Sequence, residues 1–344
     1  MVNQYVAEMN PTGRWTEKTA EDYRSAFDLF IEIIGDVPVK SIGFDTIREY
    51  KNTLLRLPPY SRQYPKYKEK SFKEILEMDF EKTLSVTTVN KKLKRISSLF
   101  NFAVKNGLML TNPVPGMMIP NIKRDEEYRA VCTPEDLNRI FHSEQYPKDD
   151  HSWSYQFWVL PIALYAGCRL EEICQLHLED IRQEQEIWVF GINNNGEKRL
   201  KNQSSARLVP IHPFLLDDLK ITEYAASLRA RGETRLFPEL TQYRDGYHPR
   251  ASAWYKYYKK RCGIVDDGEK KKDLHSFRHT FVNTLKQRRE VDTYLISELV
   301  GHTLTSITQS RYGKRYNPQI VYCAIITLDY DVYLGHLTLS RYVI

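Results

Sequence analysis

Residues 274–281 read LHSFRHTF and place His275, Arg278 and His279 at the start of a predicted helix. Histidine and arginine side chains are donors suited to a phosphate on which negative charge develops. His275 and His279 lack the further ligands that a zinc site needs. We therefore interpret His275 and Arg278 as candidate phosphate ligands and His279 as a structural residue. The competing role for each single histidine is a helix cap.

A second basic motif, AGCRLEE, occupies residues 166–172. Arg169 follows an apolar helix predicted over residues 153–166 and a glycine turn, and Glu172 comes three residues later. Taken alone, an arginine in this position is more commonly structural than catalytic. The motif gains weight only together with the others.

A lysine lies at the rim of a predicted β-hairpin. Residues 186–192 and 205–211 read as strands, and Asn193–Gly196 supplies a turn signal between them. Lys201 immediately precedes the Asn-x-Ser-Ser-x-Arg run, which favours it over Lys198 as a functional lysine. The competing interpretation is a solvated hairpin tip, because Lys198, Arg199 and Arg207 lie nearby.

A fourth motif combines a histidine with a tyrosine. Gly301-His302 is followed by Arg311-Tyr312, so Tyr312 comes ten positions after His302. A similar pattern recurs at His336 and Tyr342, but its spacing is six positions and it lies close to the end of the chain. We therefore favour Tyr312 among the 23 tyrosines as the candidate nucleophile.

These residue types together indicate one kind of chemistry. A tyrosine hydroxyl can act as a covalent nucleophile, and a lysine can donate a proton to a leaving alkoxide. No carboxylate cluster offers a magnesium site, and the cysteines are not spaced for zinc. We therefore expect phosphoryl transfer through a phosphotyrosine, with basic side chains in place of a metal and with no cofactor.

The order of these residues resembles the tyrosine recombinase (phage integrase) family. The segments that carry the resemblance are ALYAGCRLEEICQL, KNQSSARLVPIHP, LHSFRHTF and ELVGHTLTSITQSRYGK. The stretch TTVNKKLKRISSLFNFAVKNGLMLTNPV is similar to the family's core-type DNA-binding domain. The likeness covers about residues 15–335, and its specificity comes from five separated motifs in the right order.

The resemblance implies a role for each site residue. Tyr312 would attack the scissile phosphate and form a 3′-phosphotyrosyl link, while Lys201 would protonate the departing 5′-oxygen. Glu172 would fix the neighbouring basic groups. The remaining residues would bind the phosphate oxygens or assist proton transfer: Arg169, Arg278, His275 and His302.

The predicted fold is mainly α with a small antiparallel β-sheet. Residues 1–122 are expected to form a helical core-type DNA-binding domain, with helices over 16–34, 44–57, 72–80 and 85–106. Residues 123–130 would be a linker, and residues 131–344 an α+β catalytic domain with a tail from about residue 317. The resemblance favours a tail that packs on a neighbouring protomer; packing in cis is the alternative.

Composition gives weaker indications of partners and location. The 344 residues carry a net charge of +6, and no apolar run is long enough to span a bilayer. We expect a cytoplasmic protein, nucleoid-associated when bound to DNA, with no membrane partner. The resemblance implies double-stranded DNA with a specific recombination site, a homotetramer on paired sites, and room for an accessory directionality factor. DNA contacts are expected from one helix face, with a solvated face as the alternative: Lys91, Lys92, Lys94 and Arg95.

The predicted function is site-specific recombination, which cleaves and rejoins DNA during integration or excision of a prophage or genomic island. Two enzymes sharing these residues are alternatives: a chromosome-dimer resolvase and a type IB topoisomerase. A third alternative is a non-catalytic DNA-binding protein that kept the fold.

Overall fold

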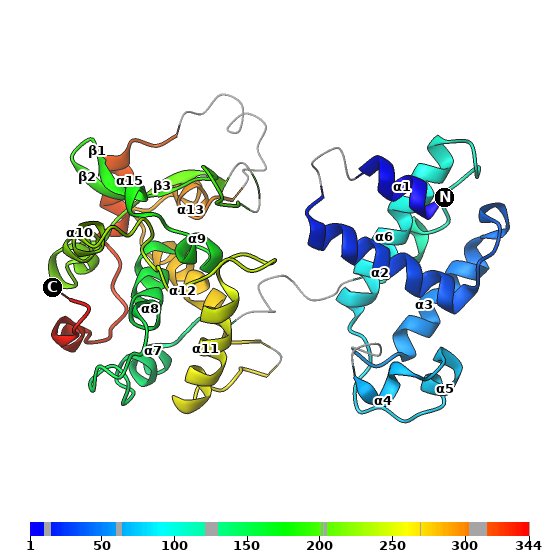
Figure 1. Cartoon of the computed structure of the whole chain (residues 1–344), viewed down its shortest axis with the longest axis horizontal. Helices are drawn as coiled ribbons and strands as arrows, with labels where there is room; N and C mark the ends of the chain where they lie inside the picture. The colour runs from blue at the N-terminus through cyan, green and yellow to red at the C-terminus, as the bar shows by residue number, and fades with distance from the viewer. Residues whose placement is uncertain are drawn as a thin grey trace. The chain divides into compact units, whose positions relative to one another are not determined.

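The computed structural model describes residues 1–9, 15–59, 64–120, 130–200, 202, 205–268, 270–302 and 315–343. The chain divides into two compact units, Met1–Arg124 and Asp125–Ile344 (Figure 1). Each unit has a hydrophobic core of its own. The fold is mainly helical with one small antiparallel sheet among the described residues, as the sequence predicted.

The N-terminal unit is helical throughout its described part. Its helices are α1 (Val2–Met9), α2 (Glu17–Ile34), α3 (Phe44–Arg56), α4 (Pro65–Lys68), α5 (Phe72–Leu76) and α6 (Val86–Lys105). Four of them were predicted from the sequence. Helix α1 and the short α4 were not predicted from the sequence.

Helix α6 is the centre of this unit because one face of it is fully apolar. Ser85 caps its first turn by accepting a hydrogen bond from the Thr88 N–H at 3.3 Å. The buried stripe matches the predicted one and follows helical spacing: Val89, Leu93, Ile96, Leu99, Phe100 and Ala103. Helices α2 and α3 pack against it, so the lysines on its other face remain outside the core.

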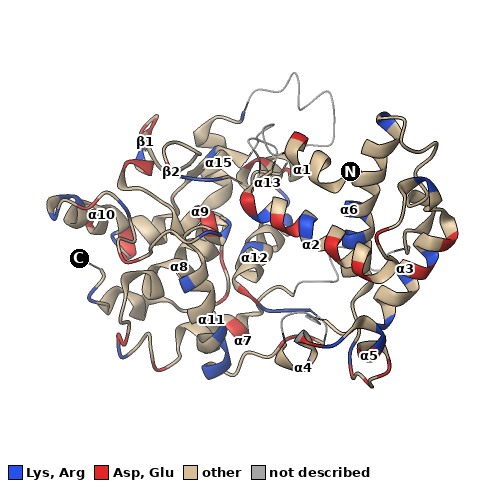
Figure 2. Ribbon diagram, turned by 45° about the vertical axis from the view of Figure 1, so that its right-hand side comes forward, with Lys and Arg blue, Asp and Glu red and all other residues tan. Residues whose placement is uncertain are grey.

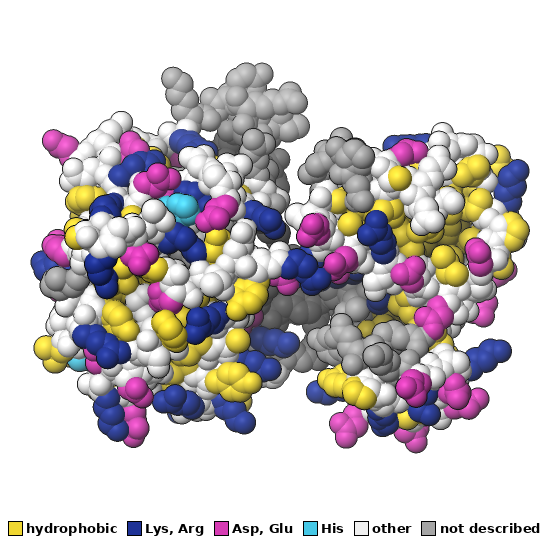
Figure 3. Space-filling view, in the orientation of Figure 1, with side chains coloured by type: hydrophobic (Ala, Val, Ile, Leu, Met, Phe, Trp, Pro, Cys, Tyr) yellow, Lys and Arg dark blue, Asp and Glu magenta, His cyan; other side chains and the backbone are white. Residues whose placement is uncertain are grey.

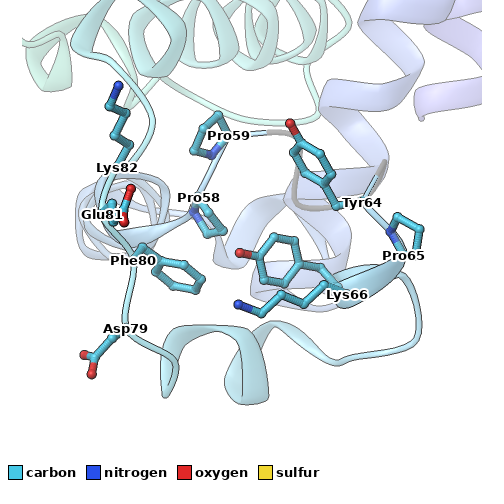
Figure 4. Close-up of a pocket in the computed structure, with 10 residues that line it drawn as sticks. Pro58, Pro59, Tyr64, Pro65, Lys66, Asp79, Phe80, Glu81 and Lys82 are labelled. Atoms are coloured by element: carbon cyan, nitrogen blue, oxygen red, sulfur yellow. The ribbon is translucent and has the colours of Figure 1, made fainter.

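A pocket of about 520 Å³ lies beside the α4–α5 segment of this unit (Figure 4). Pro58 and Pro59 follow the end of α3 and form part of its wall. The rings of Tyr67 and Phe80 also line it and meet edge to face, with centroids 5.8 Å apart. The pocket is therefore bounded mainly by rings and proline side chains.

The C-terminal unit is built around helix α8 (Ser154–Ala166), which is buried along nearly its whole length. The helices in the described part of this unit are α7 (Pro134–Phe141), α8 (Ser154–Ala166), α9 (Leu170–Cys174), α10 (Ile221–Ala230), α11 (Pro249–Arg261), α12 (Leu274–Lys286), α13 (Thr293–Leu299) and α15 (Pro318–Ile325). Helices α9, α11 and α12 pack on α8. No helix in the described part of the chain is both long and apolar enough to cross a membrane.

The sheet has three antiparallel strands, β1 (Ile181–Glu184), β2 (Ile187–Ile192) and β3 (Arg207–Pro210), in the order β1-β2-β3. The pairing of β2 with β3 confirms the predicted hairpin, with Val189 opposite Pro210. Strand β1, which is short and polar, was not predicted from the sequence.

The described residues of the tail contact their own unit. Helix α15 lies against β2 and β3, and the Tyr330 hydroxyl donates to the Leu164 carbonyl at 2.5 Å. His336 donates to the Phe141 carbonyl at 2.7 Å, and the Tyr342 hydroxyl donates to the His151 carbonyl at 3.0 Å. The second histidine–tyrosine pair is thus occupied in holding the tail to the α7–α8 region.

Candidate active site

A tight turn between α8 and α9 positions Arg169. Gly167 ends α8 in the left-handed conformation, with φ at +59°. A Cβ atom there would lie 2.3 Å from the ring of Phe281 on α12, so only glycine allows the two helices to approach this closely. Arg169 follows in extended conformation as the N-cap of α9.

We expect Gly167→Ala to destabilise the C-terminal unit by about 2–5 kcal/mol, from left-handed strain plus overpacking against Phe281. Gly196→Ala is the matched control, because Gly196 has φ +63° but nothing within 4 Å of the added methyl. Denaturant unfolding followed by tryptophan fluorescence measures both, since four of the five tryptophans lie in this unit. Equal losses in the two variants would contradict the packing argument.

Glu172 is shared between two arginines at the start of α9. Its Oε1 accepts from the Arg169 Nη1 at 2.6 Å, and its Oε2 accepts from the Arg169 backbone N–H at 2.8 Å. Oε2 also accepts from the Arg207 Nη2 at 2.8 Å. Glu172 and Arg207 are 3% and 2% exposed, whereas Arg169 is 19% exposed. Arg169 is thus the member of the trio that reaches the surface.

Arg278 of α12 connects the same turn to the end of α13. Its Nη1 donates to the Gly167 carbonyl at 2.8 Å, and its Nη2 donates to the Val300 carbonyl. Burial, together with the charges of Arg169 and Arg207, lowers the pKa of Arg278 to about 9. The guanidinium remains positive at neutral pH. The structure therefore brings the two predicted arginines together.

His302 completes the described part of this cluster. The chain leaves α13 at Gly301, which has φ +63°. The His302 N–H then donates to the Ser297 carbonyl at 2.9 Å. The Arg169 Nη2 reaches the Gly301 carbonyl at 3.4 Å. Partial desolvation and the positive charges of Arg278, Arg169 and Arg207 lower the pKa of His302 to about 4, although the residue is exposed. His302 is therefore neutral at pH 7.

The charge of the cluster favours an anion. Three guanidinium groups and the one carboxylate of Glu172 leave a net charge of +2 in the arginine cluster of Arg169, Arg207 and Arg278. Burial would raise the pKa of Glu172, but Arg207 and Arg169 hold it at about 2, so the carboxylate stays ionised. A phosphate is the natural ligand for such a site.

His275 lies at the N-terminus of α12, on the same helix as Arg278. Asp273 caps this helix and accepts from the His275 N–H at 2.9 Å. The rings of His275 and His279 meet edge to face with centroids 5.1 Å apart, and both are half-buried. His279 and His302 line a common groove of about 510 Å³ between α12 and α13.

Two of the predicted site residues, Lys201 and Tyr312, lie outside the described residues. The neighbouring Lys198 is described, and its side chain is 2% exposed. Its Nζ donates to both carboxylate oxygens of Asp180, at 2.7 and 2.9 Å. Lys198 is thus a structural lysine.

From the sequence alone, Arg207 belongs only to a basic hairpin tip. The structure instead buries it beneath Arg169 as the second partner of Glu172. Its place in the strand pattern gives one signal: Arg207 lies two residues before Val209 and therefore on the same, core-facing side of the strand. An inward-facing arginine in a strand needs a buried acid.

We expect Glu172→Gln to lower the free energy of unfolding by about 3 kcal/mol at pH 7, because it breaks a buried ion pair. The folded-state pKa of Glu172, about 2, lies below its usual 4.5. Its stabilising contribution is therefore complete above pH 4.5 and declines as the pH falls toward 2. Unfolding curves at pH 7 and pH 3.5 should show the difference between the two proteins shrinking. A constant difference would argue against the ionised pair.

The four predicted DNA-contact residues of α6 have different surroundings. Lys91 and Lys94 are exposed, while Lys92 and Arg95 are half-buried. The Arg95 Nη2 is 2.8 Å from Asp22 Oδ2, and its guanidinium lies over the ring of Tyr23. Arg95 thus joins α6 to α2 within the unit, which leaves the two exposed lysines as the better candidates.

A second basic surface covers the C-terminal end of α11. Figure 2 shows Lys and Arg in its last turn, and Figure 3 shows such side chains gathered on that part of the unit. Lys256 and Lys260 are exposed, whereas Lys259 pairs with Asp266 at 2.5 Å. The exposed lysines form a positive surface on the helix just before α12.

Family models match both units of the chain. The model of the phage integrase family matches residues 130–317, and the phage integrase SAM-like domain matches residues 1–123. The first match covers more than half of the chain, so the chain belongs to the phage integrase family. It is a tyrosine-type site-specific recombinase, as the sequence motifs predicted.

Curated relatives and solved structures agree with this assignment. A tyrosine recombinase of Pseudothermotoga lettingae is 25% identical over 236 residues, which are 68% of this chain and 73% of the relative. Tyrosine recombinase XerC of Thermodesulfovibrio yellowstonii is 25% identical over 273 residues, 77% of this chain and 84% of the relative. A lambda integrase tetramer bound to a Holliday junction has a TM-score of 0.58 at 15% identity, covering 89% of this chain and 77% of that chain. The Tn1549 transposon integrase with circular intermediate DNA also has a TM-score of 0.58, at 16% identity, and the match covers 92% of this chain and 94% of that chain. At these identities the structural likeness shows the fold.

Proposed function

We propose that this recombinase cleaves DNA with Tyr312 as the nucleophile. The Tyr312 hydroxyl passes its proton to a histidine of the site as its oxygen forms a bond to the scissile phosphorus. The bond from phosphorus to the 5′-oxygen breaks, and that oxygen takes a proton from Lys201. A 5′-hydroxyl from a partner duplex reverses the step, so bond energy is kept without ATP. The observation that carries this proposal is the arginine cluster with its net charge of +2 beside neutral His302.

The described residues supply phosphate binding in this mechanism. Arg169 and Arg278 hold the non-bridging oxygens and stabilise the charge that develops in the transition state. His275 and His302 donate or shuttle protons at the phosphate, and Glu172 orients Arg169. Lys201 is preferred to Lys198 because Asp180 already holds the Lys198 ammonium.

A nicked DNA suicide substrate tests the proposal. A duplex is first selected from a randomised pool for binding to this chain. One strand is then nicked close to the cleavage point, so that the short fragment carrying the freed 5′-hydroxyl diffuses away after cleavage. We expect an SDS-resistant protein–DNA adduct that forms in the presence of EDTA. An adduct that forms only with added magnesium would contradict the mechanism. So would the absence of any adduct on a duplex that the protein binds tightly.

We propose that its biological role is integration or excision of a mobile element. The lambda and Tn1549 integrases share its two-unit fold, and the first of them was solved as a tetramer on a Holliday junction. By analogy the working form is a homotetramer on two paired duplex sites, with an accessory directionality factor. A plasmid carrying two sites should yield recombinant circles; relaxation without exchange would indicate a topoisomerase.

Chromosome-dimer resolution is the second candidate role. Several of the curated relatives are named XerC or XerA, which favours it. The same two-site plasmid separates the roles. A resolvase converts a plasmid with two identical sites into two circles without a change in the sites, whereas an integrase joins two different sites and produces hybrid ones.

We propose that the N-terminal unit, residues 1–122, binds duplex DNA, with Lys91 and Lys94 contacting phosphates. We expect the double variant Lys91→Ala/Lys94→Ala to weaken binding to all duplexes by about tenfold near 0.15 M salt. Its slope of log affinity against log salt should fall by about 2 in magnitude. Arg95→Gln is the control, because its charge is already paired with Asp22. Fluorescence anisotropy across a salt series measures all three proteins, and equal slopes would remove these lysines from the interface.

A further inference from the structure

Arg207 is the first residue of β3 and pairs with Ile192 of β2. Its side chain is 2% exposed, so it does not reach DNA from the tip of the hairpin. A buried guanidinium is costly unless its hydrogen bonds are satisfied. The partners of Arg207 therefore indicate what its position contributes.

These partners come from three separate segments of the site. The Arg207 Nε donates to the Leu299 carbonyl at 2.5 Å, just before Gly301 and His302. Its Nη1 donates to the Ser205 carbonyl at 2.9 Å, and Ser205 Oγ in turn lies 3.1 Å from the Arg169 Nη1. Its Nη2 lies 3.6 Å from Cys168 Sγ, next to Arg169 in the chain. One side chain thus fixes the spacing of the α8–α9 turn, the start of β3 and the end of α13.

The contact with Glu172 has an electrostatic consequence. Each carboxylate oxygen of Glu172 accepts from both arginines, with Arg207 at 3.3 Å on Oε1 and 2.8 Å on Oε2. Without Arg207, the whole charge of Glu172 would act on Arg169 and compete with a phosphate for its donors. With Arg207 present, the trio of two guanidinium groups and one carboxylate keeps a net charge of +1 for the phosphate.

We propose that Arg207 is a positioning residue for DNA cleavage: it neutralises Glu172 and thereby leaves Arg169 oriented and available to the scissile phosphate. This inference rests on the proposed function, because it assumes that Arg169 binds that phosphate. Lysine cannot replace arginine here, because an ammonium lacks the planar fork that spans both carboxylate oxygens and two carbonyls.

The test measures single-turnover adduct formation at saturating suicide substrate, together with the dissociation constant for uncleaved duplex. We expect Arg207→Lys to slow adduct formation by about 100-fold while the dissociation constant changes less than about threefold. Arg182→Lys is the matched control, because Arg182 lies on β1 of the same sheet and pairs with Glu184 on the surface. Tryptophan fluorescence and the thermal midpoint verify that each variant is folded.

A double-variant comparison separates positioning from general loss of structure. If Arg207 acts through Glu172, Arg207→Lys in a Glu172→Gln background should slow cleavage no more than about threefold further. A structural role would multiply the two losses. Should Arg207→Lys alone unfold, Arg207→Met/Glu172→Gln removes both buried charges, and its rate is compared with that of Glu172→Gln.

The outcomes distinguish this inference from the proposed function. No adduct from the wild-type protein on a tightly bound duplex overturns the proposed function. A wild-type adduct with an unchanged rate in Arg207→Lys overturns the role of Arg207 alone. Full multiplication of the losses in the double variant overturns it as well, and a non-multiplicative loss supports it.

Discussion

We expect Tyr312→Phe to abolish the covalent protein–DNA adduct on a suicide substrate and to leave binding of the intact duplex unchanged. The substitution removes only the hydroxyl oxygen that would attack the phosphorus, and a phenyl ring has no other nucleophile. Loss of a nucleophile costs roughly 10³-fold or more in rate. The adduct should therefore fall below detection on SDS gels at any incubation time that gives a complete wild-type reaction.

Two other tyrosines provide controls that the structure makes specific. Tyr316 lies four residues further on, and its backbone N–H donates to Glu298 Oε1 at 3.1 Å. Tyr342 belongs to the second histidine–tyrosine pair, but its hydroxyl donates to the His151 carbonyl and its ring stacks on Phe157 with centroids 5.8 Å apart. Tyr316→Phe and Tyr342→Phe should both keep the adduct. If Tyr312→Phe still formed the adduct and either Tyr316→Phe or Tyr342→Phe did not, the nucleophile would be that other tyrosine.

The sequence predicted the elements whose burial pattern is regular. The stripe on α6 has a helical period that side-chain burial enforces, and β2 is a short apolar run that is buried except at the partly exposed Trp188, so the positions of both were confirmed. Strand β1 was not predicted because it is four residues long and polar. The turn that follows it places Gln185 and Glu186 at positive φ, so the glycine or asparagine that usually marks such a turn is missing from the sequence. Helix α1 was not predicted because its apolar residues pack on partners far along the chain; the ring centroids of Tyr5 and Phe102, for example, are 5.2 Å apart.

The candidate site shows the same division. Arg169 and Arg278 could be predicted because each lies in a short, specific sequence motif. The structure brings both residues to the turn between α8 and α9. Arg207 was not singled out, although its place two residues before Val209 puts it on the core-facing side of the strand, because its role depends on a carboxylate 35 residues away. The contact of the tail with its own unit depends in the same way on distant pairs such as Tyr330 with Leu164, 166 residues apart. Long-range contacts of this kind leave no periodic trace in a sequence.

Arg169→Ala should reduce the rate of adduct formation by about 10²–10³-fold, the usual loss when one donor to a developing oxyanion is removed. The fold should survive, because Glu172 keeps its bond to Arg207 at 2.8 Å and is not left as an unpaired buried charge. Arg169 is also the most exposed member of the trio, so little packing is lost. The thermal midpoint should therefore stay within a few degrees of wild type.

Arg169→Lys separates charge from geometry at this position. The ammonium keeps the positive charge but cannot donate in the planar, two-point manner of a guanidinium, so we expect a rate between those of wild type and Arg169→Ala. Arg182→Ala, which removes an arginine from a surface pair with Glu184, should cleave at the wild-type rate. Single-turnover rates at saturating DNA compare the four proteins. If Arg169→Ala lost duplex affinity and cleaved at full rate once saturated, Arg169 would contribute to binding of the ground state and not to the transition state, because only an interaction strengthened in the transition state lowers the barrier.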